Sequence, residues 1–358
     1  MISFITEHVS FKFIQIKKIV FNKKIIIIIL IIMFNIIIIF HFKDGRYGVF
    51  FEEEINNNKM FSTYCLTLEE KMKNYKTKKF VIIRRLESPN SGFFSFYIVH
   101  LGCINKYLLD GYIPIIDLQS FNNVYNKGNT SKINPWELFF YQPYNYTLEE
   151  VKKYAKKYKY LICTGKFFRP DEVNIYYDNN SIFSWHNFAM KYMPIKKEIL
   201  QEVYIIMKKL FHNSKNILGV LIRGTDYISK KPKGHSIPPK VEQVVKDVKI
   251  MDKKYKYDYI FFSTEDEIIK QKFIHHFVNK IKVLNPSVII NYNYKKKYNI
   301  NLHEKIIGNL DFVKNYILNI IILSKCLDII ISRCSGAAGI FIFSKGFRNT
   351  KIYNLGLY

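Results

Sequence analysis

Apolar and polar positions alternate through most of this chain in the manner of an α/β protein. After the first 78 residues, short apolar runs rich in β-branched residues are followed by longer segments whose apolar positions have helical spacing. Because strands separated by helices usually pair in parallel, this order predicts an α/β fold with mostly parallel sheets. The predicted strands cover residues 79–85, 112–118, 257–263, 287–292, 327–332 and 350–355, and another begins at residue 217.

The predicted helices begin and end at ordinary helix signals. The helix of residues 94–109 stops before Gly111, and a helix opens at Thr147 with Thr-Leu-Glu-Glu, which is typical of a capping box. The surrounding region, residues 120–166, is otherwise irregular. The remaining helices cover residues 195–211, 239–249, 267–277, 312–324 and 337–343.

An almost unbroken apolar run covers residues 25–42. As a helix it would span roughly 27 Å, just enough to cross the hydrocarbon core of a bilayer. Lysines precede the run more densely than they follow it, so the positive-inside rule predicts a cytosolic arm, residues 1–24, and a single-pass type II membrane protein. This topology implies the Golgi or endoplasmic reticulum lumen in a eukaryote and the inner membrane in a bacterium. The alternative is a buried core helix.

The rest of the chain divides by composition. Residues 43–77 are polar and charged, which is typical of a stem. Two α/β segments follow, residues 78–205 and residues 206–358, and we interpret them as the two halves of the main fold.

The net charge of the chain indicates which binding partners are favoured. The 358-residue chain has 49% hydrophobic residues and a net charge of +26, from 55 basic and 29 acidic residues. Such a balance favours anionic partners, for example phosphates, a membrane surface or an acidic glycan. The lysines are scattered and no nucleic-acid motif occurs, so nucleic-acid binding is not predicted. The five cysteines lack CxxC spacing, and no metal site is predicted.

The first candidate site is the end of the strand that begins at residue 217, where Arg223-Gly224-Thr225-Asp226 follow. An arginine at the carboxyl end of a parallel strand suits a phosphate, because its planar fork donates two hydrogen bonds at once. Gly224 lets the backbone approach a ligand, and Thr225 and Asp226 offer hydrogen bonds to a sugar or phosphate. The alternative is a surface turn in which Arg223 and Asp226 pair.

Two further strands end in polar residues. Ser263-Thr264-Glu265-Asp266 provides carboxylates that can accept two N–H bonds, as from a guanine edge, or simply an N-cap. In the segment from Ser332 to Gly339, small residues before a helix can present backbone N–H groups to phosphate, or merely allow close packing. Because all three strand ends meet at one sheet edge, the sequence predicts a nucleotide-sugar site there.

These segments resemble, in the same order, three motifs of the fucosyltransferase superfamily that contains α-1,6-fucosyltransferases, nodulation fucosyltransferases and protein O-fucosyltransferases. The resemblance rests on the Arg223 segment, the Thr264-Glu265-Asp266 segment and the stretch from Leu323 to Ser335. Similarity to bacterial-type glycosyltransferases of this superfamily adds residues 90–95, 111–117, 134–137 and 231–235.

The resemblance implies a GT-B-like architecture of two Rossmann-like halves with mostly parallel sheets, preceded here by one transmembrane helix. The donor, commonly GDP-fucose, would bind the C-terminal half and the acceptor the N-terminal half. Arg223 would hold the donor β-phosphate, Asp266 would read guanine, and Ser335 would lie near the donor. The predicted donor-binding residues are Arg223, Gly224, Thr225, Thr264, Asp266, Ser332, Ser335 and Gly336, and the predicted acceptor-side residues are Ser91, Gly92, Tyr97 and His100.

Several positions depart from the family pattern. Leu221 stands where the family often has histidine, Gly224 where α-1,6 enzymes have a second arginine, and Tyr227 where a lysine is usual. The glutamate proposed as the base in α-1,6 enzymes has no clear match. The candidates for deprotonating an acceptor hydroxyl are therefore Asp226 and His235, which join Arg223 as predicted catalytic residues. His235 as a plain turn residue is the alternative.

The sequence thus predicts a membrane-anchored, inverting glycosyltransferase that transfers fucose from GDP-fucose to a hydroxyl of a glycan or glycoconjugate. The resemblance implies no metal and no cofactor beyond the nucleotide sugar. A transferase for another nucleotide sugar is the first alternative. A non-catalytic glycan-binding protein on the same fold is the second, suggested by the missing base, and a membrane-anchored nucleic-acid binder is the third, suggested by charge alone.

Overall fold

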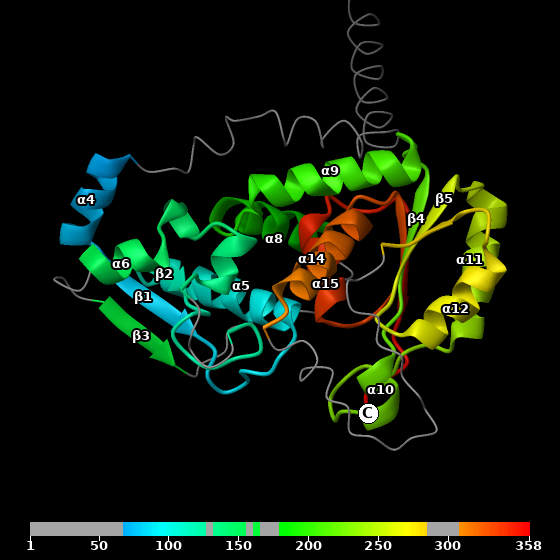
Figure 1. The fold of residues 1–358 in the computed structure, drawn as a ribbon, viewed down its shortest axis with the longest axis horizontal. Helices are drawn as coiled ribbons and strands as arrows, with labels where there is room; N and C mark the ends of the chain where they lie inside the picture. Colours follow the sequence, from blue (N-terminus) through cyan, green and yellow to red (C-terminus); the bar gives the residue numbers. More distant parts are fainter. Residues whose placement is uncertain (1–66, 127–131, 155–159, 165–178, 285–307) are drawn as a thin grey trace, which may run out of the picture. The chain divides into compact units, whose positions relative to one another are not determined.

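The computed structural model describes residues 67–126, 132–154, 160–164, 179–284 and 308–358 (Figure 1). The chain divides into two compact units, Met1–Val49 and Phe50–Tyr358, and every described residue belongs to the second. The predicted cytosolic arm and membrane-spanning run lie outside the described residues. Among the residues that are described, no helix combines the length and the apolar character needed to cross a bilayer.

A three-stranded parallel sheet forms the N-terminal part of this unit. Its spatial order is β2 (Tyr112–Ile116), β1 (Lys79–Arg84) and β3 (Tyr160–Thr164). Helix α5 (Phe93–Leu109) connects β1 to β2 and packs against both, which confirms the predicted order of a strand, a helix and a second strand over residues 79–118.

The other face of this sheet is covered by α4 (Leu68–Thr77) and α6 (Leu148–Tyr154). Tyr75 and Val151 pack on that face in one apolar cluster with strand residues such as Phe80. The capping box of α6 is present: the Glu150 N–H donates to Thr147 Oγ1 at 3.1 Å, and the Thr147 N–H donates to Glu150 Oε2 at 2.8 Å. Helix α4 falls inside the segment that we interpreted as a stem.

A five-stranded parallel sheet forms the C-terminal part. Its spatial order is β6 (Ile281–Lys282), β5 (Tyr259–Ser263), β4 (Ile217–Leu221), β7 (Asp328–Ser332) and β8 (Thr350–Tyr353). Counted along the chain, this is the order 3-2-1-4-5 of doubly wound dinucleotide-binding sheets. The structure therefore confirms an α/β fold with parallel sheets.

Helices cover both faces of the second sheet (Figure 1). One face packs against α11 (Val241–Tyr255) and α12 (Glu267–His276) in a cluster of their apolar residues with those of β4 and β5. The opposite face packs against α9 (Lys197–Phe211), α14 (Leu310–Ser324) and α15 (Ser335–Phe343).

The apolar core on this opposite face also includes residues of the first sheet and its helix α5. It includes Phe93 to Ile104 on α5 as well as Ile329 of β7 and Ile340 of α15. Helix α15 packs directly against α5, α14 and α8 (Asn179–Tyr192). One continuous apolar core therefore joins the two sheets.

Most predicted elements are present with ends shifted by a few residues. The helix predicted at residues 239–249 extends to Tyr255, and β3 and α8 appear where no element was predicted. The short β6 is, counted along the chain, the third strand of the second sheet. The strand predicted at residues 287–292 lies outside the described residues. Short turns of 3-10 helix cover Pro135–Leu138 and Pro143–Asn145.

Candidate functional site

The strand order of the second sheet reverses between β4 and β7. In open α/β sheets, ligands bind at the carboxyl ends of the strands where this reversal occurs. Arg223 follows β4, and its backbone N–H donates to the side-chain oxygen of Ser332 at the end of β7, at 3.3 Å. This hydrogen bond links two of the three strand ends that were predicted to form the site.

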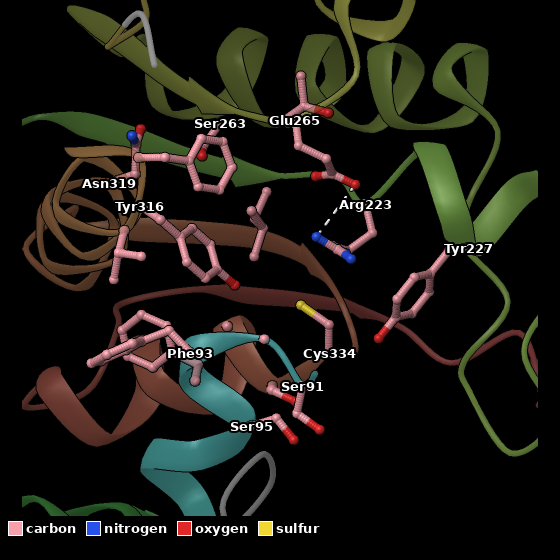
Figure 2. A pocket seen from close by; sticks show the side chains of 18 of the residues that line it. Ser91, Phe93, Ser95, Arg223, Tyr227, Ser263, Glu265, Tyr316, Asn319 and Cys334 are labelled. Atoms are coloured by element: carbon pink, nitrogen blue, oxygen red, sulfur yellow. Dashed lines mark ion pairs between the residues drawn. The ribbon is translucent and has the colours of Figure 1, made fainter. Parts of the chain in front are cut away.

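A cavity of about 290 Å³ lies at this sheet edge. Sites for small molecules range from about 300 to 1,000 Å³, so the cavity lies at the lower limit of this range. Its walls come from the ends of β4, β5 and β7, the start of α5 and one side of α14 (Figure 2). The predicted site residues that line it are Ser91, Gly92, Arg223, His235, Thr264, Ser335 and Gly336.

Arg223 contributes a cation to the lining of this cavity. Its Nη1 lies 3.4 Å from Glu265 Oε1, with 17% and 11% of the two side chains exposed. The same carboxylate oxygen accepts the backbone N–H of Gly224 at 2.8 Å. The guanidinium also stacks 4.7 Å from the ring centre of Tyr227. Its position is therefore set by contacts on two sides.

Glu265, and not Asp266, is the carboxylate that lines the cavity. Asp266 is fully buried and caps α12, where its Oδ1 accepts the N–H groups of Ile268 and Ile269 at 3.0 and 3.1 Å. A Cβ atom on Gly224 would lie 2.6 Å from the Asp266 side chain, so only glycine fits above it. The structure thus gives Asp266 the capping arrangement that was the alternative interpretation of this segment.

Lys270 adds a second cation to the lining. This lysine is only 9% exposed, and its Nζ lies 3.4 Å from Glu267 Oε2. Buried lysines are rare unless an anion compensates them. Both cations of the cavity are therefore paired with glutamates from the segment that leads from β5 into α12.

The third strand end places Cys334, Ser335 and Gly336 against the cavity. Cys334 is the N-cap of α15, with its sulfur accepting the N–H of Ala337 at 3.4 Å. Burial raises the pKa of the Cys334 thiol, although the Arg223 charge opposes the shift. Gly336 is needed for packing, since a Cβ there would lie 2.3 Å from the Tyr316 hydroxyl.

The other predicted residues lie elsewhere. Ser332 is buried at the end of β7, and Gly224 is buried above Asp266. Thr225 begins α10 (Thr225–Lys230), and the side chains of Thr225 and Asp226 are outside what the structure describes. His235, by contrast, lines the cavity and is exposed beside Tyr227, with ring centres 5.2 Å apart.

Tyr97 and His100 do not reach the cavity. Both are fully buried on α5, within the shared apolar core. Burial and the nearby Arg85 charge lower the pKa of His100 to about 3. The structure thus places only the start of α5, with Ser91 and Gly92, in the candidate site.

The lining residues missed from the sequence include Glu265 as the cavity carboxylate, Lys270, Tyr316 and Asn319. A signal existed for Asn319, because it is a lone amide among the buried residues Ile317–Leu323 of α14. Among the described residues, no group of three or more His, Cys, Asp or Glu side chains is arranged to hold a metal ion.

No protein-family model and no curated protein matches the sequence. Among solved structures, the chain is similar to NodZ α-1,6-fucosyltransferase co-crystallized with GDP, at 12% identity and a TM-score of 0.46, with 75% of this chain and 93% of that chain covered. NodZ from Bradyrhizobium aligns at 14% identity and a TM-score of 0.41 over 71% and 88%. POFUT1 in complex with GDP aligns at 10% identity and a TM-score of 0.47 over 78% and 99%.

Proposed function

We propose that the chain is a glycosyltransferase whose nucleotide-sugar donor binds in the cavity at the ends of β4, β5 and β7. The proposed donor is GDP-fucose, and the proposed acceptor is a hydroxyl group of a glycan or glycoconjugate. The observation that supports this most directly is Arg223, a partly buried arginine at the strand-order reversal, in a cavity that all three predicted strand ends line.

The proposed reaction is a single displacement that inverts the anomeric carbon. The acceptor oxygen forms a bond to that carbon, the bond between the carbon and the β-phosphate oxygen breaks, and GDP leaves. Arg223 would meet the developing charge on the diphosphate with charge-assisted hydrogen bonds. Backbone N–H groups at Ser335 and Gly336, in the first turn of α15, would add to this stabilisation without a metal ion.

The acceptor proton needs a base beside the cavity. His235 lines the cavity and is exposed, so it is accessible to an acceptor that enters from solvent. We assign it the role of base in the proposal, with Asp226, on the first turn of α10, as the second candidate.

The wider proposal keeps the organisation predicted from the sequence. The two sheets would represent the acceptor and donor halves of a GT-B-like enzyme. Residues 25–42 would anchor it as a type II membrane protein, in the Golgi or endoplasmic reticulum of a eukaryote or the inner membrane of a bacterium.

Calorimetric titration with GDP, UDP and GDP-fucose tests the donor. We expect GDP and GDP-fucose to bind and UDP to bind much more weakly. Arg223→Ala should weaken GDP binding by about 1.5–3 kcal/mol, the value of a hydrogen bond to a charged group. Lys233→Ala, which removes one exposed positive charge nearby, is the matched control and should leave the affinity unchanged. Tight binding of UDP without GDP would contradict the assignment of GDP-fucose.

A non-catalytic binding protein is the second candidate, and one observation favours it. Among the described lining residues, Glu265 is the one with a carboxylate side chain. It already pairs with Arg223 and accepts the Gly224 N–H, so it is poorly placed to act as the base of a transfer reaction. Release of GDP from GDP-fucose across a panel of glycan acceptors separates the candidates. An enzyme should release GDP and lose this activity in His235→Ala while GDP binding persists. No release with any acceptor would favour the binding protein.

A further inference from the structure

The cavity has a second wall that none of the three strand ends supplies. Phe312, Tyr316 and Asn319 follow one another at helical spacing on α14 and all line the cavity. In Figure 2, Tyr316 lies between Asn319 and Arg223, and Ser263 lies on the Asn319 side. The cavity therefore has an amide at one end, an aromatic middle section and the Arg223 cation at the other end.

Asn319 is an unusual residue for its position. Only 6% of it is exposed, and its neighbours along α14, from Ile317 to Leu323, are buried and mostly apolar. Burying an amide in such surroundings costs free energy unless hydrogen bonds replace those with water. A leucine would fill this position at lower cost if packing were its only role.

The orientation of the Asn319 amide is fixed by its own helix. Its Nδ2 donates to the backbone carbonyl of Asn315, one turn earlier, at 2.8 Å. A carbonyl can only accept, so the amide nitrogen must face it and the Oδ1 atom must face away. Among the described residues, this is the side chain's one hydrogen bond, so Oδ1 retains its acceptor capacity.

We propose that Asn319 determines which nucleobase the cavity accepts, with its Oδ1 receiving an N–H from the base while Arg223 holds the diphosphate. This inference rests on the proposed function and adds a specificity residue to the same site. Tyr316 and Phe312, about one and two turns away on the same helix side, provide flat apolar surfaces for the ring system of a base. An acceptor at this position favours a base edge that presents N–H groups, such as N1–H and the exocyclic amine of guanine, over an edge that presents only acceptors.

Binding of two probes to three variants tests the proposal. GDP carries a base and a diphosphate, whereas inorganic pyrophosphate carries the diphosphate alone, and both are measured by displacement of a fluorescent GDP analogue. Asn319→Leu should weaken GDP about tenfold, as expected for one hydrogen bond left unmade, and leave pyrophosphate within twofold. Asn319→Asp keeps an oxygen acceptor and should retain more affinity for GDP than Asn319→Leu. Arg223→Ala should weaken both probes.

Asn216 offers a matched control. Its Nδ2 also donates to a backbone carbonyl, that of Lys256 at 2.9 Å, and its Oδ1 is unpartnered, but it does not line the cavity. Asn216→Leu should therefore leave GDP affinity unchanged.

The outcomes separate this inference from the proposed function. Unchanged GDP affinity in Asn319→Leu, or an equal loss for GDP and pyrophosphate, would overturn the role of Asn319 while leaving the donor site intact. If the unaltered protein binds neither probe, the proposed function and the inference both fail.

Discussion

Arg223 and Glu265 form an ion pair between the segments that follow two neighbouring strands, with Nη1 and Oε1 3.4 Å apart. Glu265 also accepts the Gly224 N–H, so one carboxylate engages both a cation and a backbone donor of the site. An incoming diphosphate would have to share or replace these contacts. The affinity of the cavity for the proposed diphosphate would therefore depend on Glu265 as well as on Arg223.

Glu265→Gln should tighten GDP binding. The amide keeps an oxygen for the Gly224 N–H but removes the negative charge that competes for Arg223. A partly exposed ion pair contributes about 1 kcal/mol or less, so we expect a gain of up to roughly fivefold, reduced by added salt. Calorimetry at two ionic strengths measures it. Weaker binding would mean that Glu265 contacts the ligand directly, and Glu242→Gln, on the surface, controls for the change in net charge.

The buried His100 should make stability depend on pH. Its folded pKa of about 3 lies below the ordinary value of 6.5, so the unfolded chain takes up the proton first as the pH falls. Stability from the neutral imidazole is complete above pH 6.5 and is lost from there downward toward pH 3. By pH 5 the loss should reach about 2 kcal/mol.

Urea unfolding at pH 7 and pH 5 measures this loss, and His100→Phe should reduce it by that amount. His276→Gln, which alters an exposed histidine, should leave the difference between the two pH values unchanged. An equal pH dependence in His100→Phe and the unaltered protein would contradict the assignment.

Asp328 should be among the most costly polar residues to replace. It is fully buried at the start of β7 and accepts bonds from Arg348 Nη2 at 2.5 Å, from the Asn349 N–H at 2.7 Å and from the Tyr257 hydroxyl. Removing one partner of such a network costs roughly 3 kcal/mol. Asp328→Ala should lower the free energy of unfolding by about that amount in urea titrations.

The pair of Lys280 and Asp252, 2.9 Å apart, is the control for Asp328 because it is more exposed. Asp252→Ala should cost about 1 kcal/mol or less. Equal costs for the two aspartates would show that burial of the Asp328 network does not stabilise the fold.

Gly339→Ala should displace the Phe94 ring and so alter the wall of the cavity. A Cβ at this position of α15 would lie 2.4 Å from the Phe94 ring, and Phe94 lines the cavity. Overpacking of this kind costs about 1–3 kcal/mol, and the displaced ring should also weaken GDP binding. Adding Phe94→Leu should restore part of the stability, which a double-mutant cycle in urea measures. A strictly additive cycle would contradict the contact.

The strand ends could be predicted because their signal is local. A buried apolar run followed by Arg223 indicates both a strand and the polar group at its carboxyl end. The side on which each polar residue lies was harder to predict. Asp266 and Glu265 are adjacent, and which one faces the cavity depends on which one caps α12, a detail of backbone geometry.

The acceptor-side prediction shows a second limit. Tyr97 and His100 follow Ser91 and Gly92 closely in sequence, but a helix rises about 1.5 Å per residue, so His100 lies roughly 10 Å from the start of α5. Only the first turn can reach the cavity. Asn319, by contrast, enters the site through a helix whose position depends on the whole second sheet, and no local pattern indicates that packing.

The contact of Phe94 with Gly339 bears on where this molecule could be divided to build chimeric proteins. Because α5 packs into α15, a chimera cut between the two sheets would leave aromatic side chains of α5 facing a foreign helix surface. A chimera that keeps this packing would have to leave α5 with the recipient's C-terminal part, and to replace only the segments around β2 and β3. The boundary at which segments of this protein could be exchanged thus lies within its first sheet and not between its two sheets.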